Sequence, residues 1–289
     1  MSIDQAIPVS ALLRPMPGRS SANFRKTMSI IRARLARRPA SYSRISWPVW
    51  AGACLLLTAA AMIFLDGGAA DWRAQLPAGF VATARTFTDF GLGGWYLIPP
   101  AVLLLLANLL DWRTLSKRWH MVACNWTCLA FFMLGAAGLS GLAVTVLKHV
   151  IGRQRPNLAG VELLSLHPFA FEARFASFPS GHATNVGAVA AMVMLLSPSW
   201  GKYVVLPVTV WIAVTRVVVG MHYPSDTIAG FGLGVACTVA TALIFARLGF
   251  IFRRTAAGLP VRKKTFRLRA TWRKRASPPP IRFLETANP

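Results

Sequence analysis

The sequence predicts an all-α integral membrane protein built as a bundle of six spanning helices. Of its 289 residues, 55% are hydrophobic and only 14% are charged, whereas soluble domains average about 25% charged residues. The apolar residues gather into six runs of 19 to 27 residues, each long enough to cross a bilayer. The basic residues cluster at the two ends of the chain, outside these runs.

The first expected span lacks any charge over twenty residues. A cleavable signal peptide would have a shorter leader and a shorter apolar core, so we interpret this run as a membrane helix. Pro99 and Pro100 predict a kink in the second run, and the third is long enough to tilt or to extend beyond the bilayer. The six expected spans are 46–65, 90–110, 121–147, 183–201, 203–221 and 227–246.

On this basis the chain divides into three segments. Residues 1–45 form a basic N-terminal tail, 46–248 hold the six-span domain, and 249–289 form a basic C-terminal tail. The N-terminal tail is rich in Pro, Ser and Arg, which favours disorder. The alternative is a short basic amphipathic helix at 24–38 on the membrane surface.

The net charge of +23, taken alone, would suggest a nucleic-acid partner. Its distribution argues against one, because basic residues that flank apolar runs are typical of topology signals and of contact with anionic headgroups. The four cysteines lie inside apolar runs with no metal-binding spacing. We therefore interpret them as packing residues and expect no metal at Cys54, Cys124, Cys128 or Cys237.

The third run ends at Lys148-x6-Arg155-Pro156. Residues seven apart lie on one helical face, and Pro156 favours an extended conformation at Arg155 that ends any helix there. An arginine presents a fork to phosphate oxygens and a lysine presents a point charge. The pair is therefore suited to one anion, although a Lys/Arg pair found alone more often just flanks a span.

The fourth run is preceded by Pro179-Ser180-Gly181-His182. Ser180 is suited to cap a helix, and Gly181 allows close approach of the backbone. The exposed N–H groups at such a helix start favour phosphate, and His182 lies where it can protonate a leaving oxygen. Alone, this motif would indicate only a capped helix with a surface histidine.

The fifth run contains Arg216, and a charge within a span is costly enough to indicate a function. His222 and Asp226 follow, four residues apart. At that spacing the carboxylate can hold one ring nitrogen and leave the other as an unprotonated nucleophile. Pro224 between them can open the next helix.

The three motifs lie on the same predicted side of the membrane, and together they resemble those of the type 2 phosphatidic acid phosphatases (PAP2). That family also includes the vanadium haloperoxidases. The motif resemblance covers residues 148–226, with Thr215 where the family has Ser. It implies a PAP2/haloperoxidase-type helix bundle and a metal-independent phosphatase without a cofactor.

The resemblance also implies a role for each motif residue. His222 would be the nucleophile that forms a phosphohistidine, Asp226 would orient it, and His182 would be the general acid and then the base. The phosphate would be bound by Lys148, Arg155, Ser180, Gly181 and Arg216. Four polar neighbours are interpreted as mainly structural: His149, Arg153, Asn157 and His167.

The expected substrate is a phosphomonoester or diphosphate on an outer-leaflet lipid. Lipid A phosphate and undecaprenyl diphosphate are favoured, and phosphatidylglycerophosphate or phosphatidate is the alternative. The long 149–181 connection would lie at the headgroup boundary, and Asp89 could touch a headgroup. A haloperoxidase is disfavoured because those family members are soluble, and a non-enzymatic anion-binding or transport protein would leave the His222–Asp226 spacing unexplained.

Charge asymmetry predicts the topology. The N-terminal tail has nine Lys/Arg, the C-terminal segment from Arg247 twelve and the two connections on that side four, giving 25 against 7 on the other side. The positive-inside rule then places both termini in the cytoplasm of a bacterial inner membrane, with the motifs facing the periplasm or exterior. A reporter that is active only outside the cytoplasm should therefore be silent at residue 289 and active near 165. Equal activity at both positions would refute the six-span topology.

Overall fold

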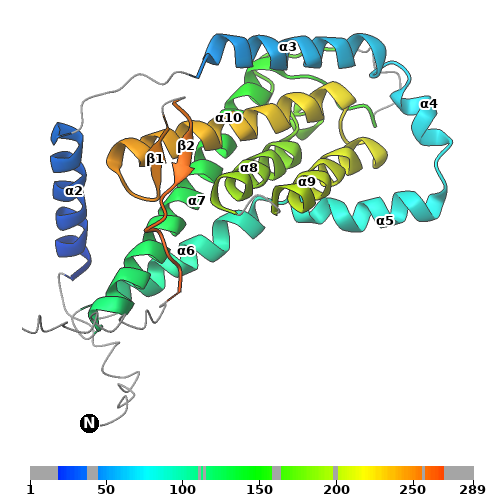
Figure 1. Ribbon diagram of the computed structural model, residues 1–289. Coiled ribbons are helices and arrows are strands. Elements are labelled where there is room, and N and C mark those ends of the chain that lie inside the picture. The colour runs from blue at the N-terminus through cyan, green and yellow to red at the C-terminus, as the bar shows by residue number, and fades with distance from the viewer. Residues whose placement is uncertain are drawn as a thin grey trace, which may run out of the picture.

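The computed structural model describes residues 19–37, 45–109, 112, 115–157, 164–197, 201–255 and 258–269. The remaining parts of the two predicted tails lie outside the described residues. Helices dominate the molecule, as Figure 1 shows, and α8 lies among α7, α9 and α10. The predicted all-α membrane bundle is confirmed in its architecture.

Each of the six apolar runs contains a long helix: α3 (Trp47–Phe64), α6 (Gly94–Leu109), α7 (Lys117–Ile151), α8 (Gly181–Leu196), α9 (Gly201–Val218) and α10 (Pro224–Leu248). Among the described residues, four stretches are long and apolar enough to cross a membrane, namely α3, α7, α10 and the stretch 78–109 that contains α6. The apolar helices α8 and α9 are shorter. The sixteen residues of α8 rise only about 24 Å, so the count of six spans is approximate.

Several shorter elements were not predicted. They are α4 (Ala69–Ala74), α5 (Ala78–Thr88), η1 (Asp89–Gly91), η3 (Ala173–Phe175) and the antiparallel strands β1 (Phe252–Arg254) and β2 (Pro260–Arg262). The helix α5 precedes α6 and packs on α9, where the rings of Phe80 and Trp211 meet edge to face. The strands β1 and β2 form a small hairpin at the start of the predicted C-terminal tail.

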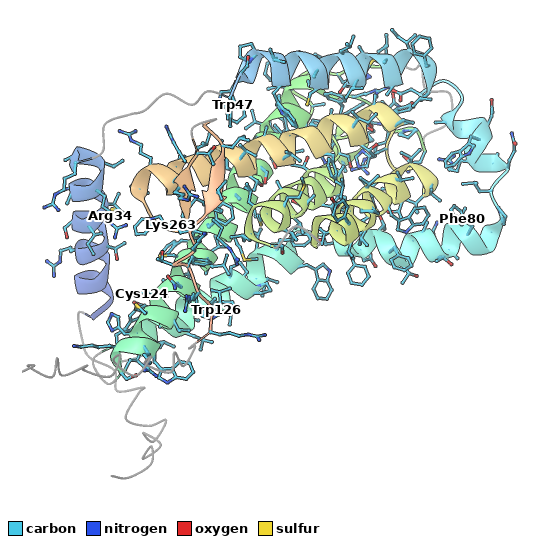
Figure 2. All side chains as sticks on the ribbon, in the orientation of Figure 1. Arg34, Trp47, Phe80, Cys124, Trp126 and Lys263 are labelled. Atoms are coloured by element: carbon cyan, nitrogen blue, oxygen red, sulfur yellow. The ribbon has the colours of Figure 1, made fainter. Side chains whose placement is uncertain are left out.

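The preference for disorder in the N-terminal tail is wrong for residues 19–37, which form the helix α2 (Arg19–Arg37). Tertiary contacts explain the difference. Arg34 donates from Nη1 to the carbonyl of Leu248 at 3.0 Å and lies over the Phe250 ring. Lys263 donates to Gly249 at 2.6 Å from the hairpin side. Figure 2 shows Arg34 and Lys263 on either side of this region, where they complement the negative end of α10.

The end of α7 also differs from one expectation. Gly152 adopts φ +62° and its N–H bonds to the carbonyl of Lys148 at 2.8 Å, so the helix ends at Ile151. Any Cβ at Gly152 would lie 1.7 Å from the His167 carbonyl oxygen. Lys148 and Arg155 therefore do not share a helical face: Lys148 is in the last turn, and Arg155 is in the following loop.

The helices α8 and α10 cross so closely that glycine is required between them. A Cβ at Gly234 would lie 2.0 Å from the Thr184 carbonyl oxygen. Small residues allow such packing where lipid provides no hydrophobic drive between helices. The same pair is joined at its motif end, because the Ser180 N–H donates to the carbonyl of Asp226 at 2.9 Å. The second and third motifs are thus held together by the packing of these helices.

Replacing Gly234 with alanine should destabilise the bundle by roughly 1–3 kcal/mol or more, because the methyl group overlaps the α8 backbone. The matched control is Gly138→Ala in α7, where an added Cβ meets nothing within 4 Å. Thermal unfolding in detergent should show a lower midpoint for Gly234→Ala and an unchanged or higher one for Gly138→Ala. Equal midpoints for the two variants would contradict the close crossing.

Candidate active site

The three sequence motifs come together at the ends of four helices. Lys148 lies in the last turn of α7, Arg216 in the last turn of α9, and Asp226 in the first turn of α10. His182 lies in the first turn of α8, and the charges of Lys148, Arg155 and Arg216 all act on it. Side chains from all three motifs therefore share one electrostatic environment.

The start of α8 provides the backbone part of the site. Ser180 is the N-cap, as expected, and its Oγ accepts a long hydrogen bond of 3.4 Å from the Ala183 N–H. A Cβ at Gly181 would be 3.5 Å from Lys148 Nζ, so the ammonium group lies beside the backbone at this helix start. An ammonium group next to free N–H groups makes a suitable place for a phosphate oxygen.

Two arginines complete the cationic part of the site. Arg155 donates from Nε to the carbonyl of Ala173 at 2.9 Å, which anchors its guanidinium group. Burial lowers the pKa of Arg155, with the Asp226 carboxylate acting in the opposite direction. Arg216 donates from Nη1 to Thr88 Oγ1 at 3.0 Å. Its Nε is buried and has no hydrogen-bond partner among the residues that the structure describes, so an anion at this place would satisfy a costly free donor.

His222 is held by a backbone carbonyl. Its Nδ1 lies 2.8 Å from the carbonyl oxygen of Ser177, and since a carbonyl can only accept, Nδ1 carries the proton. The lone pair is then on Nε2, as a nucleophile requires. The nearest Asp226 oxygen lies 3.6 Å from Nδ1, beyond the range of a good hydrogen bond. Direct orientation of the ring therefore comes from Ser177, a residue that the sequence motifs did not indicate.

Burial also sets the protonation state of His222, which is only 2% exposed. It lowers the pKa of the imidazole to about 4, against the opposing effect of Asp226. The ring is therefore neutral at neutral pH, with its Nε2 lone pair available.

Both carboxylate oxygens of Asp226 accept hydrogen bonds. Its Oδ1 accepts from Arg153 Nη1 at 2.7 Å, and its Oδ2 accepts from Ser177 Oγ at 2.6 Å and from the Tyr223 N–H at 2.9 Å. Arg153, interpreted from the sequence as mainly structural, thus contacts the site directly. It also pairs with Asp66 at 2.9 Å, which sequence analysis did not single out. Neither residue carries a sequence signal that separates it from other interfacial charges.

The other expected neighbours lie further from the chemistry. His149 and His167 stack on Phe171 and Phe175, with ring centroids 4.7 and 4.1 Å apart, and Asn157 is exposed. The hydroxyl of Thr215 donates to the Ile212 carbonyl at 2.6 Å inside α9. It is fully buried there, bonded to the backbone of its own helix.

One wall of the site comes from the segment between α3 and α6. A Cβ at Gly91 would lie 2.8 Å from His182 Cδ2, and Asn185 donates to the Gly91 carbonyl at 2.9 Å. Thr88 contacts Arg216 from the same segment. The unpredicted α5–η1 stretch thus packs directly against a motif histidine and a motif arginine.

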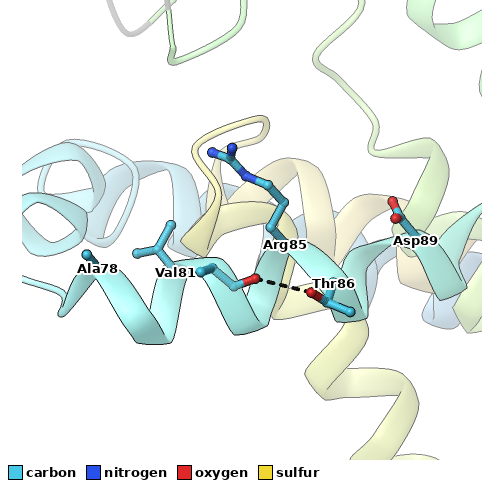
Figure 3. A pocket seen from close by; sticks show the side chains of 6 residues that line it. Ala78, Val81, Arg85, Thr86 and Asp89 are labelled. Atoms are coloured by element: carbon cyan, nitrogen blue, oxygen red, sulfur yellow. Dashed lines mark hydrogen bonds between the residues drawn. The ribbon is translucent and has the colours of Figure 1, made fainter.

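A groove of about 550 Å³ runs along α5, beside the histidine pair rather than at it. Figure 3 shows Arg85 rising from α5 into this space and Asp89 at one end. Asp89 lies close enough to Arg216 for its charge to act on it. The remaining lining residues are Ala78, Val81, Ala82 and Thr86. The groove therefore adjoins the cationic site through its Asp89 end.

No group of three or more His, Cys, Asp or Glu side chains suited to a metal ion occurs within the described ranges. The positive charge available to an anion comes from Lys148, Arg155 and Arg216. Three cations near one helix start are suited to a phosphate group and to the charge that develops when it is transferred.

Comparisons with known proteins agree with this chemistry. Residues 126–250 match the model of the PAP2 superfamily. The chain is 35% identical over 219 residues to lipid A 1-phosphatase of Rhizobium johnstonii, covering 74% of this chain and 89% of that one. It is 32% identical over 163 residues to decaprenylphosphoryl-5-phosphoribose phosphatase of Mycobacterium tuberculosis, covering 54% and 75%. The crystal structure of Aquifex aeolicus LpxE aligns with a TM-score of 0.40 at 18% identity, over 58% of this chain and 88% of that one.

The buried state of His222 predicts a pH-dependent stability. Its folded pKa of about 4 lies below the ordinary value of about 6.5, so the unfolded chain binds more protons between these values. Stability should therefore fall as the pH is lowered from about 6.5 towards 4, by at most about 1.4 kcal/mol per unit from this group. Thermal midpoints at pH 7 and pH 5 should differ more for wild type than for His222→Gln. An identical pH dependence would show that His222 is not buried as described.

Proposed function

Since this chain belongs to the PAP2 superfamily and is a membrane lipid phosphatase, we propose that it hydrolyses the 1-phosphate of lipid A through a phosphohistidine intermediate. The observation that carries the mechanism is the bond from His222 Nδ1 to the Ser177 carbonyl at 2.8 Å. It leaves the Nε2 lone pair as the nucleophile, next to three cations. The substrate is supported by the lipid A 1-phosphatase relative, of which the chain covers 89%.

In the first step, His222 Nε2 attacks the phosphorus atom and the bond to the sugar oxygen breaks. His182 donates a proton to that oxygen, so the dephosphorylated lipid leaves as an alcohol. Lys148, Arg155 and Arg216 hold the phosphate oxygens, together with the Ser180–Gly181 helix start. Their fixed charges surround the three equatorial oxygens of the transferring group and are in place before the transition state forms, so no reorganisation is needed at that moment.

In the second step, His182 takes a proton from water, and the oxygen of that water attacks the phosphohistidine. The P–N bond breaks, inorganic phosphate leaves and His222 regains its neutral form. Asp226 supports the turn that carries His222 through its bonds to Ser177 Oγ and the Tyr223 N–H. The three cations supply the charge stabilisation that a metal ion gives in other phosphatases, so the proposed reaction is metal-independent.

The proposed site faces the periplasm or the exterior of a bacterial inner membrane, with both termini in the cytoplasm. The charge asymmetry of 25 against 7 Lys/Arg supports this orientation. Lipid A carries a large headgroup, and the groove along α5 offers about 550 Å³ beside the cationic site. Arg85 in that groove is suited to a second anionic group of the same lipid.

A panel of purified lipids tests the substrate and the mechanism together. In detergent with a metal chelator present, wild-type protein should release inorganic phosphate from lipid A, and vanadate should inhibit it as a mimic of the pentavalent transition state. We expect kcat/KM for lipid A to exceed that for undecaprenyl diphosphate and phosphatidylglycerophosphate by about tenfold or more. Mass spectrometry should locate the lost phosphate at the 1-position.

In the same assay His222→Ala should lose activity by at least about 10³-fold, as expected when a nucleophile is removed. The matched control is His149→Ala, which removes a histidine that stacks on Phe171 and should stay within about threefold of wild type. A preference for undecaprenyl diphosphate would refute the lipid A assignment. An active His222→Ala variant, or a strict need for Mg²⁺, would refute the phosphohistidine mechanism.

A further inference from the structure

Asp66 lies just after α3 and is buried beside the catalytic end of the bundle, with 2% of its surface exposed. Its Oδ1 accepts from the Ser225 N–H at 3.0 Å, and its Oδ2 accepts from Ser225 Oγ at 2.5 Å and from Arg153 Nη2 at 2.9 Å. The residue lies outside the 126–250 region that matches the family model. A carboxylate from the first span thus reaches the turn that carries the third motif.

Arg153 connects Asp66 to the rest of the site. One of its terminal nitrogens binds Asp66 at 2.9 Å, and the other binds Asp226 Oδ1 at 2.7 Å and Ser225 Oγ at 2.8 Å. Its guanidinium group also lies 4.1 Å from the centre of the Tyr223 ring. The carbonyl of Arg153 accepts from the Ser177 N–H at 3.0 Å. Both the side chain and the backbone of Arg153 therefore hold residues next to His222.

A short chain of contacts then leads to the reacting nitrogen. Ser177 is held from two sides, since its N–H bonds to Arg153 and its hydroxyl bonds to Asp226 at 2.6 Å. Its carbonyl accepts a hydrogen bond from His222 Nδ1 at 2.8 Å. The direction of the Nε2 lone pair follows from the direction of that carbonyl. The Arg153 guanidinium group acts on Asp226 directly and on Ser177 through the bond between Ser177 Oγ and Asp226.

We propose that Asp66 is a positioning residue for catalysis, which holds Arg153 in the one orientation that aligns Ser177, Asp226 and hence His222. This inference rests on the proposed role of His222 as nucleophile. It assigns to the first span a part in the reaction in addition to membrane anchoring. The span is otherwise peripheral: α3 lies along the outer side of α10, and side chains such as Leu56 and Ile63 are more than 70% exposed.

Electrostatics make Asp66 suited to this task. Without Asp66, the described bonds of the guanidinium group to Asp226 and Ser225 would both come from the one nitrogen Nη1. With a carboxylate on each terminal nitrogen, its plane is set from two directions. Removing one partner of a buried pair is costly because the remaining charges lose their match. The arginine would then shift towards Asp226, and displacements of about 1 Å near a nucleophile can cost about 10²-fold in rate.

The test measures kcat and phosphate affinity separately, on monodisperse protein in detergent. Asp66→Asn should lower kcat on the order of 10- to 100-fold, while the inhibition constant of inorganic phosphate stays within about threefold, because Lys148, Arg155 and Arg216 are untouched. Asp66→Glu keeps the charge and should recover part of the loss. The matched control is Asp71→Asn, which removes an exposed carboxylate in α4 and should leave both constants unchanged.

A purely structural role for Asp66 predicts a different pattern: a lower thermal midpoint with kcat per folded molecule unchanged. That result, or a kcat for Asp66→Asn within about threefold of wild type, would overturn the proposal. If Asp66→Asn does not fold, Asp66→Glu applies the same test, because the longer side chain keeps the charge but displaces the carboxylate that binds Arg153 Nη2. A loss of kcat at constant phosphate affinity in that variant supports the proposal, and an unchanged kcat overturns it.

A water-soluble aryl phosphate serves as the substrate in these assays, so that kcat does not depend on the identity of the lipid. If wild type cleaves the aryl phosphate but not lipid A, the substrate assignment fails while the Asp66 measurement still decides the positioning role. If His222→Ala cleaves the aryl phosphate at the wild-type rate, the nucleophile is wrong and the positioning proposal fails with it.

Discussion

A charge buried in an apolar bundle must be paired, and this requirement governs the catalytic end of the molecule. Arg153 and Asp226 are 1% and 0% exposed, and an isolated ion in such surroundings would cost several kcal/mol. Their pairing joins the loop after α7 to the first turn of α10. The partners that complete it come from the turn before α8 and the end of α3. Four segments distant in sequence are thereby held in one arrangement.

Two sets of charges at this end behave differently. Asp66, Arg153 and Asp226 satisfy one another through direct bonds. The charges of Lys148, Arg155 and Arg216 also act on one another, and the two arginine side chains donate to neutral oxygens of Ala173 and Thr88. Under the proposed function, a dianionic phosphate would pair with these cations, so that the first set supplies rigidity and the second supplies affinity for the anion.

Much of this arrangement could be predicted from the sequence, because its signals are local. Uncharged runs indicate the long helices, and the spacing of Ser180 and Pro224 indicates where α8 and α10 begin. The convergence of the three motifs followed from placing them on one side of a membrane.

The αL conformation of Gly152 separates Lys148 from Arg155, and it depends on the distant His167 carbonyl, so spacing alone could not reveal it. Asp66 and Ser177 contribute through contacts across 159 and 45 to 49 residues of sequence, for which a single chain carries no periodic signal. A helix in the N-terminal tail was predicted only as the alternative, at 24–38, because the order of α2 comes from docking of Arg34 on α10 rather than from composition.

The eleven-residue helix α5 is separate from the residues that perform the chemistry, yet it forms the wall against which a lipid would lie. Its last turn contacts Arg216 through Thr88, and several of its residues line the groove. Changes at Val81, Ala82 or Arg85 would alter which headgroup is accommodated without touching the histidines. Under the proposed function, the headgroup preference of this chain would depend on one short, largely exposed helix, while the reaction depends on the buried network around His222.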